Sequence, residues 1–275
     1  MSSVPQFDSA RGGSRGHLLR ELRRHLVRWE ASPAEDAEVF SSGAAAIDRL
    51  LPGGGLRYGM LVEWISAPGG GAATLGLLAA REACREGGTL VVLDRQQTFY
   101  PPAAAAWGID LDQLIIVRPR NARDELWAAV QSLRSPAVAA VWGKIDRLDS
   151  RGFRRLQLAA QAGRTLGLLL RPSSARGQPS WADVRLEVES RAESQESRAR
   201  TPALGSRLLA LDSLRRVRIQ VLRTRSGRPG GWAMLEIDDA AHTIQEASAN
   251  QHAPHPLPVV TELADPADRS RSARA

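Results

Sequence analysis

The segment from Trp64 to Leu75 reads Trp-Ile-Ser-Ala-Pro-Gly-Gly-Gly-Ala-Ala-Thr-Leu, with the glycines and the flanking elements of a phosphate-binding loop. In the pattern G-x-x-x-x-G-K-[ST], the lysine reaches the β- and γ-phosphates and the hydroxyl holds Mg²⁺. Ala72 and Ala73 stand at those two positions here, and Ser66 replaces the first glycine. The pattern indicates the scaffold of a nucleotide site without the side chains that carry out its chemistry.

The distribution of lysine, arginine, histidine and cysteine limits which ligands this protein is expected to bind. Lys144 is the only lysine in the 275 residues, so no other lysine could replace the missing loop residue. The net charge of +7 and the isoelectric point near 10.9 come from scattered arginines, which predicts weak or indirect DNA contact at most. The histidines show no ligand spacing with the single cysteine, Cys84, or with a carboxylate, so we expect no bound metal.

Helix and strand patterns alternate around the loop. A strand at Met60–Ile65 precedes it, a helix at Thr74–Arg85 follows, and Thr89–Asp94 is a continuous apolar run typical of a buried parallel strand. Further helices are predicted at Pro101–Trp107, Ala122–Leu133 and Ser150–Ala162, and further strands at Leu114–Val117, Ala137–Trp142, Leu166–Arg171 and Asp183–Glu189. The alternation predicts an α/β fold with a mostly parallel sheet covered by helices. Arg215–Arg225 and Trp232–Ile237 predict an antiparallel hairpin at the sheet edge.

The chain divides into five predicted regions. They are a disordered N-terminus (1–15), a basic amphipathic helix with an acidic linker (16–38), an α/β domain (39–238), a flexible insertion within it (190–206), and a disordered tail (239–275). The first helix, Gly16–Glu30, carries its apolar stripe at three- and four-residue spacing, in Leu18, Leu22, Leu26 and Trp29. Such a stripe packs on its own domain or binds a partner, and the sequence leaves both open.

The residues around the loop resemble a known family. Phe40-Ser-Ser-Gly43, the run Ile47–Leu56 with its Pro-Gly-Gly-Gly-Leu turn, and Gly59–Glu63 follow one another as in the ATPase core of the RecA superfamily. Within that superfamily, the turn and the chain length look most similar to ImuA, the RecA-like accessory protein of the bacterial mutasome. The resemblance covers Phe40 to Asp238 and implies a RecA-like core. The same group includes SulA-like division inhibitors.

The resemblance allows each catalytic position to be checked. The glutamate that activates water in RecA corresponds to Gln96, and the Mg²⁺-linked aspartate corresponds to Gly143. Asp146 lies three residues further on and is interpreted as a helix-start or surface residue. The loop itself comprises Ser66, Gly69, Gly70, Gly71, Ala72, Ala73 and Thr74, of which only Gly71 and Thr74 match at informative positions. Loss of the lysine, the hydroxyl, the base and the metal carboxylate together predicts neither ATP hydrolysis nor a cofactor.

Two further RecA features are altered or ambiguous. A long glycine-rich DNA-contacting loop follows the strand that matches Leu166–Arg171, whereas Pro172–Ser180 here is short and contains only Arg176 as a positive charge. Arg223 and Arg225 match a basic pair that in RecA reaches a neighbour's nucleotide. They are candidates for binding a partner's carboxylates, and a solvated basic strand edge is the alternative.

The tryptophans fall into two groups. Those in or beside segments expected to be mobile are candidates for partner contacts, since tryptophan is enriched at interface hot spots. Those on regular elements are expected to be buried or partly buried. The first group is Trp29 and Trp181, and the second is Trp64, Trp107, Trp127 and Trp142.

The resemblance to ImuA implies a non-catalytic adaptor in SOS-associated, error-prone translesion DNA synthesis. Its partners would be an ImuB-like polymerase homologue and, through it, a DnaE-type error-prone polymerase. An active RecA/KaiC-type ATPase with an atypical site and a SulA-like cell-division inhibitor are the alternatives. The N-terminal residues lack a signal-peptide core, and no stretch approaches the ~20 apolar residues of a membrane span, so we expect a cytoplasmic protein.

Overall fold

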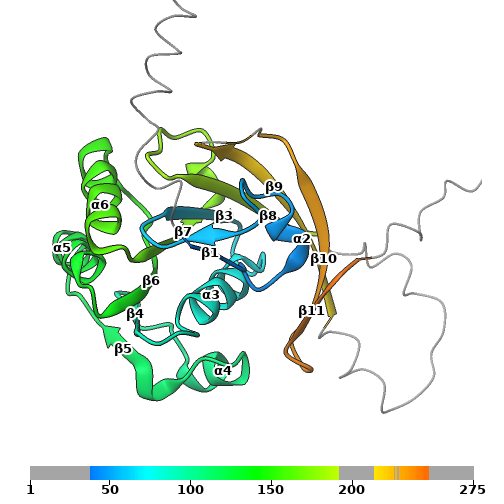
Figure 1. Cartoon of the computed structure of the whole chain (residues 1–275), viewed down its shortest axis with the longest axis horizontal. Helices are drawn as coiled ribbons and strands as arrows, with labels where there is room; N and C mark the ends of the chain where they lie inside the picture. Colours follow the sequence, from blue (N-terminus) through cyan, green and yellow to red (C-terminus); the bar gives the residue numbers. More distant parts are fainter. Residues whose placement is uncertain (1–37, 192–213, 226, 228, 248–275) are drawn as a thin grey trace, which may run out of the picture.

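The computed structural model describes residues 38–191, 214–225, 227 and 229–247. A nine-stranded sheet runs through them in the order β11-β10-β9-β8-β3-β7-β6-β4-β5 (Figure 1). The parallel strands are β3 (Leu61–Ser66), β4 (Thr89–Leu93), β5 (Leu114–Val117), β6 (Val138–Lys144), β7 (Leu166–Pro172) and β8 (Val184–Arg191). The antiparallel extension is β9 (Leu214–Thr224), β10 (Trp232–Asp238) and β11 (Thr243–Glu246). The predicted parallel sheet with an antiparallel hairpin is confirmed.

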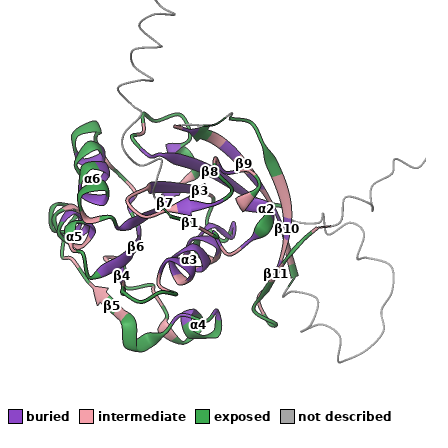
Figure 2. Cartoon of the chain, viewed as in Figure 1, coloured by how far each residue is buried: buried purple, intermediate pink, exposed green. Residues whose placement is uncertain are grey.

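Helices cover both faces of this sheet. One face packs against α2 (Ala45–Asp48), α3 (Ala72–Ala83) and α4 (Pro101–Ala106), and the other against α5 (Ala122–Arg134) and α6 (Ser150–Gly163). Short 3₁₀ turns, η2 (Leu111–Gln113) and η3 (Ser173–Ala175), lie in connections, and β1 (Val39–Phe40) pairs with β2 (Leu56–Arg57). Alternate residues of β3 enter opposite core clusters, with Trp64 on the α3 side and Leu61 on the α6 side. Figure 2 shows this burial concentrated in the strands and on the inner faces of the helices.

Local sequence explains where the helices begin. Asn121 caps α5 by accepting a hydrogen bond from the Asp124 N–H at 2.9 Å, and Asp149 caps α6 by accepting from the Gly152 N–H at 2.7 Å. By contrast, α3 begins after Gly71, which has φ 91° and supplies no side-chain cap. In the described part of the chain, no helix combines the length and apolar character that crossing a membrane requires.

The boundaries of two predicted disordered segments are wrong. Residues 243–246 form β11, with Ile244 opposite Ile237 of β10, so the tail prediction fails for residues 239–247. The only large apolar side chain in β11 is Ile244, so the order of this strand comes from backbone pairing with β10 and from the Arg49–Glu246 ion pair. The insertion predicted from residue 190 also starts too early, because β8 pairs with β9 as far as Arg191. The helix predicted at 16–30, with Leu18, Leu22, Leu26 and Trp29, lies outside the described residues.

Three of the four tryptophans expected to be buried are buried, and one is not. Trp64, Trp107 and Trp142 are within the core cluster on the α3 side. Trp127, however, is 62% exposed. It lies on the side of α5 opposite Ala129 and Leu133, which face the sheet, so helical phase places its indole outward.

The contact between α5 and α6 depends on glycine. A Cβ added at Gly163 would lie 2.0 Å from the Leu133 carbonyl oxygen and 2.9 Å from the Arg134 backbone. We expect Gly163→Ala to lower the free energy of unfolding by roughly 1–3 kcal/mol, although alanine has the higher helix propensity. Urea denaturation measures this. Gly177→Ala is the control, because a Cβ there meets nothing within 4 Å. Equal stability of both variants would contradict the close helix contact.

Burial of the single cysteine sets its reactivity. Desolvation raises the pKa of the Cys84 thiol to about 11, from an ordinary value of 9.0. Because the thiolate is the nucleophile, iodoacetamide at pH 8 should alkylate the native protein roughly 100-fold more slowly than the urea-unfolded chain. The native rate should keep rising up to about pH 11, while the unfolded rate levels off near 9. Mass spectrometry follows the reaction, and equal native and unfolded rates at pH 8 would contradict this prediction.

Candidate functional site

The phosphate-loop segment is a closed turn between β3 and α3. β3 ends at Ser66, the Gly70 N–H donates to the Ala67 carbonyl at 3.0 Å, and α3 begins at Ala72. Gly71 adopts the left-handed conformation at this junction, which glycine tolerates without steric cost. The predicted strand–loop–helix order is therefore present, with its turn geometry made by glycines.

The C-terminal strands pack directly against this loop. A Cβ added at Gly71 would lie 3.1 Å from Ile237 Cδ1 and 3.2 Å from Val217 Cγ1, on β10 and β9. Ala72, at the position of the missing lysine, is only 3% exposed and belongs to the same apolar cluster. Arg215 donates from Nη1 to the Gly69 carbonyl at 3.0 Å and holds the loop from outside. The first turn of α3 is thus part of the hydrophobic core.

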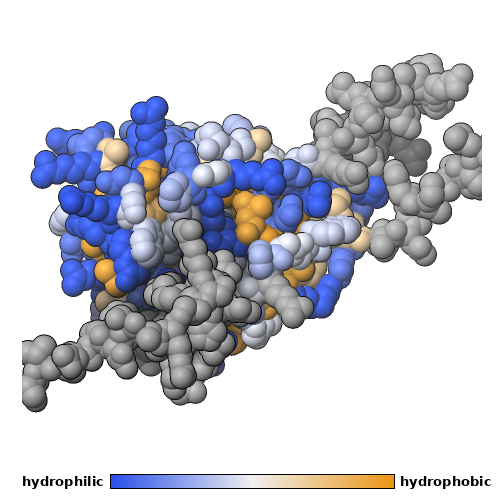
Figure 3. Space-filling view, turned by 90° about the horizontal axis from the view of Figure 1, so that it is seen from above, coloured by the Kyte–Doolittle hydropathy of each residue, from blue (hydrophilic) through white to orange (hydrophobic). Residues whose placement is uncertain are grey.

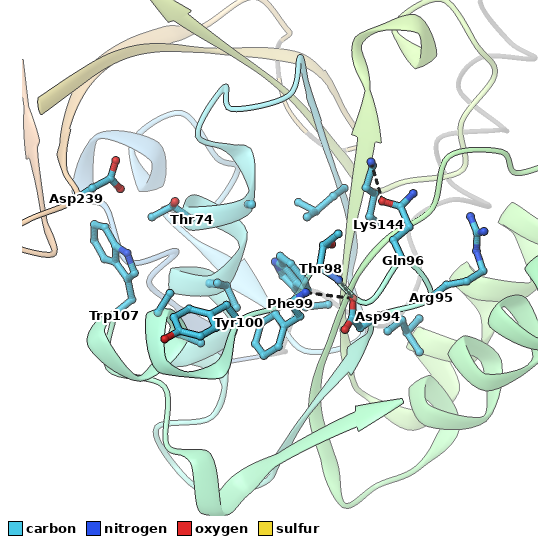
Figure 4. A pocket seen from close by; sticks show the side chains of 17 residues that line it. Thr74, Asp94, Arg95, Gln96, Thr98, Phe99, Tyr100, Trp107, Lys144 and Asp239 are labelled. Atoms are coloured by element: carbon cyan, nitrogen blue, oxygen red, sulfur yellow. Dashed lines mark hydrogen bonds between the residues drawn. The ribbon is translucent and has the colours of Figure 1, made fainter. Parts of the chain in front are cut away.

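Gly143 and Gln96 occupy the two positions where RecA carries acidic residues, and their surroundings differ. Gly143 of β6 pairs with Leu93 of β4, and a Cβ at Gly143 would lie 2.8 Å from Leu93 Cβ, so this site has no room for an aspartate. The Gln96 side chain accepts from Lys144 Nζ at 3.1 Å (Figure 4). It also donates to Asp146 Oδ2 at 3.0 Å. Gln96 and Lys144, the only lysine in the sequence, are therefore hydrogen-bonded to each other.

The same network extends to a buried carboxylate. Asp146 lies 3.9 Å from Lys144 Nζ and 3.8 Å from Arg95 Nη2, and Arg95 Nε donates to Glu125 Oε2 at 3.0 Å. Burial raises the pKa of Glu125, and Arg95 opposes that rise. Of the two interpretations of Asp146, the helix start is wrong, since α6 begins at Ser150, whereas a surface position agrees with its side chain being 37% exposed. Among the described residues, no group of histidines, cysteines and carboxylates could hold a metal ion.

A cavity of about 420 Å³ lies beside the loop, between α3 and the segment after β4 (Figure 4). Thr74 lines one side, Phe99, Trp107 and Trp142 supply aromatic walls, and Lys144 lies at the rim. Asp94 shapes this cavity, since its Oδ1 accepts from the N–H groups of Thr98 at 2.8 Å and Phe99 at 3.2 Å. Sequence reasoning missed Asp94, although an aspartate directly after a buried strand is a signal for such a turn.

The loop after β7 is fixed to the sheet. Its turn η3 contains Ala175, which is fully buried, and Arg185 of β8 donates to the Ala175 carbonyl at 2.8 Å and to the Gln178 carbonyl at 3.1 Å. Arg171 also donates from Nη2 to Gln178 Oε1 at 2.8 Å. The prediction that this segment offers no long mobile loop agrees with these contacts.

A buried carboxylate neutralises those arginines. Glu63 of β3 is 1% exposed, and its oxygens lie 2.6 Å from Arg185 Nε and 3.8 Å from Arg171 Nε. Desolvation lowers the pKa of Arg171, and Glu63 counteracts this effect. Removal of one partner from such a pair leaves an uncompensated charge in the core, so this cluster specifies how the loop folds.

The basic pair at the C-terminal end of β9 has two structural roles. Arg225 Nη1 forms an ion pair with Asp183 Oδ1 at 3.0 Å, and Asp183 also accepts from the Leu61 N–H at 2.8 Å. Arg223 is exposed and donates to the Ser180 carbonyl at 2.7 Å. The alternative of a solvated strand edge is therefore wrong for Arg225. Trp181, in the same region, lies under the Arg154 guanidinium at 5.0 Å and is 39% exposed.

Comparison with known proteins identifies the family. The chain is 30% identical over 257 residues to "Protein ImuA" of Caulobacter vibrioides, covering 86% of this chain and 94% of that protein. The chain belongs to the ImuA family. The RecA N-terminal domain family also matches, over residues 23–147.

The ImuA family member is also similar to RecA over part of its length, and to a recombinase in its fold. The chain is 38% identical over 129 residues to "Protein RecA" of Nostoc punctiforme, which covers 45% of this chain and 36% of that protein. The structure described as "Crystal structure of the RadB recombinase" superimposes with a TM-score of 0.54 at 17% identity, covering 76% of this chain and 99% of that one. The RecA-like fold is thereby confirmed.

Restoration of the missing loop residues tests the packing of α3. Because Ala72 is 3% exposed within the core cluster on the α3 side, we expect the double variant Ala72→Lys, Ala73→Thr to lose about 2 to 4 kcal/mol of unfolding free energy and to gain no ATP turnover. Ala73→Thr alone is the control, since Ala73 is exposed and should tolerate the change to within about 0.5 kcal/mol. Urea denaturation and phosphate release provide the measurements. A stable double variant that hydrolyses ATP would show that only the side chains are missing.

Proposed function

We propose that this protein is a non-catalytic adaptor in SOS-associated, error-prone translesion DNA synthesis. The observation that carries the proposal is the burial of Ala72 in the core cluster on the α3 side, at the position where an active loop needs its lysine. Phosphoryl transfer depends on positioned charge, and this position supplies none. The fold is retained while the position of the lysine is filled by apolar contacts.

The other catalytic positions support the same proposal. Gln96 can orient water but cannot accept its proton, and its amide is already bonded to Lys144 and Asp146. Gly143 offers no carboxylate and no space for one. An atypical RecA/KaiC-type ATPase would need a substitute base and a metal ligand, and Asp146 is held by Arg95 and Lys144 instead. We therefore favour the adaptor over that alternative.

The proposed partner is an ImuB-type polymerase homologue and, through it, a DnaE-type error-prone polymerase. Membership of the ImuA family supports this assignment. DNA contact is proposed to be weak or indirect, because the loop after β7 is held by Arg171 and Arg185 and Arg225 is paired with Asp183. The chemistry of synthesis would then belong to the partners.

Purified protein mixed with a purified ImuB-type protein tests the adaptor. We expect a stable complex by size-exclusion chromatography with light scattering, and no phosphate release from ATP and Mg²⁺ above the buffer rate, with or without the partner. RecA serves as the positive control for turnover. ATP hydrolysis that is lost in Thr74→Ala would overturn the non-catalytic assignment. Absence of a complex, together with binding to the tubulin-like division protein, would favour the SulA-like alternative.

A further inference from the structure

The outward faces of α5 and α6 form a cationic surface that the fold does not use. Arg123 and Arg134 on α5 and Arg151 and Arg155 on α6 are exposed, and none of their guanidinium groups pairs with another residue in the described ranges. At the left of Figure 3, where these helices lie, the surface is largely hydrophilic with small hydrophobic patches. This set of arginines is called the α5–α6 surface below.

Helix geometry places these side chains along one shared strip. Both helices connect parallel strands, so they run in the same direction, and their close contact at Gly152 and Gly163 sets them side by side. Leu126 lies 3.1 Å from a Cβ at Gly152, and the Arg134 backbone 2.9 Å from one at Gly163, so these positions mark the α5 side that faces α6. By helical phase, Arg123 and Trp127 border that side, as Arg155 does on α6.

Stability of the helices does not account for Arg123 and Arg151. Arg123 and Arg151 occupy the first turns of α5 and α6, where the helix dipole favours negative rather than positive side chains. The Asp124 carboxylate, nearby on α5, accepts from Asn121 Nδ2 at 2.8 Å as part of the helix cap. Unpaired arginines at positions that cost helix stability indicate a charge complement that is outside the described part of the chain.

Two apolar side chains lie among the arginines. Trp127 is 62% exposed and Leu158 is 47% exposed, one on each helix. Exposed tryptophan and arginine are the residues most enriched at protein-binding hot spots, with charged groups at the rim. A nucleic-acid backbone would neutralise the arginines but would leave Leu158 in water, since leucine offers no ring on which a base can stack.

We propose that the α5–α6 surface binds an acidic, amphipathic segment of a protein partner. Its carboxylates pair with Arg123, Arg151 and Arg155, while its apolar face covers Trp127 and Leu158. The inference rests on the proposed adaptor function, because it assigns the place where that function's partner docks.

The test compares two matched double variants in the full chain. Arg155→Glu with Trp127→Ala alters the proposed surface. Arg218→Glu with Trp232→Ala is the control on β9 and β10, where the half-buried Arg218 guanidinium lies 5.4 Å from the exposed Trp232 ring. Circular dichroism melts verify that both fold. Affinity for an immobilised ImuB-type protein is measured at 50 and 300 mM NaCl, with a fluorescent 30-nucleotide single strand as a second probe.

We expect the Kd of the α5–α6 variant for the ImuB-type protein to rise at least 10-fold at 50 mM NaCl, with less than a 2-fold change in the control. The unaltered chain should lose more affinity between the two salt concentrations than the α5–α6 variant does. Equal binding by both double variants would overturn the proposed docking surface but would not contradict the proposed adaptor function. Loss of DNA binding alone would reassign the surface to nucleic acid, and no binding by the unaltered chain would overturn both proposals.

Discussion

The packing of the first turn of α3 against β9 and β10 is the contact on which the rest of the domain depends. It packs α3 against the antiparallel extension, which the β8–β9 pairing joins to the parallel sheet. A Cβ at Gly71 would lie 3.1 Å from Ile237 Cδ1 and 3.2 Å from Val217 Cγ1, and the positive φ of Gly71 also favours glycine. Ala72 then completes the apolar cluster at a position where a lysine would bring a charge into the core. The contact thus contributes to the core at the position where a phosphate-binding loop carries its lysine.

A second constraint operates on the opposite face of the sheet. Glu63 is buried in β3, and it is tolerated there because Arg171 and Arg185 lie beside it. Those arginines in turn hold the carbonyls and the amide of the loop after β7. A segment that could have been mobile is therefore tied to the central strand. The phosphate-loop segment and the loop after β7 are therefore both held in place by contacts with the interior of the domain.

The bounds of several strands could be predicted because each strand is a continuous run of apolar residues. Leu114–Val117 matches β5 without error, and α5 and α6 begin at the predicted residues because Asn121 and Asp149 cap them. β11 could not be predicted, since its order comes from pairing with β10 rather than from its own residues. The exposure of Trp127 was missed for a related reason, as helical phase relative to the sheet fixes it.

The sequence by itself determined which chemical groups are missing. Through the resemblance to RecA, Ala72, Gln96 and Gly143 stand where the lysine, the base and the metal carboxylate would be, and the alternating pattern specifies the α/β class. Only the tertiary structure decided what replaced them. The burial of Ala72 and the bonding of Gln96 to Lys144 arise from residues far apart in the chain. Strand order brings such residues together, and contacts across strands leave no periodic signal in the sequence.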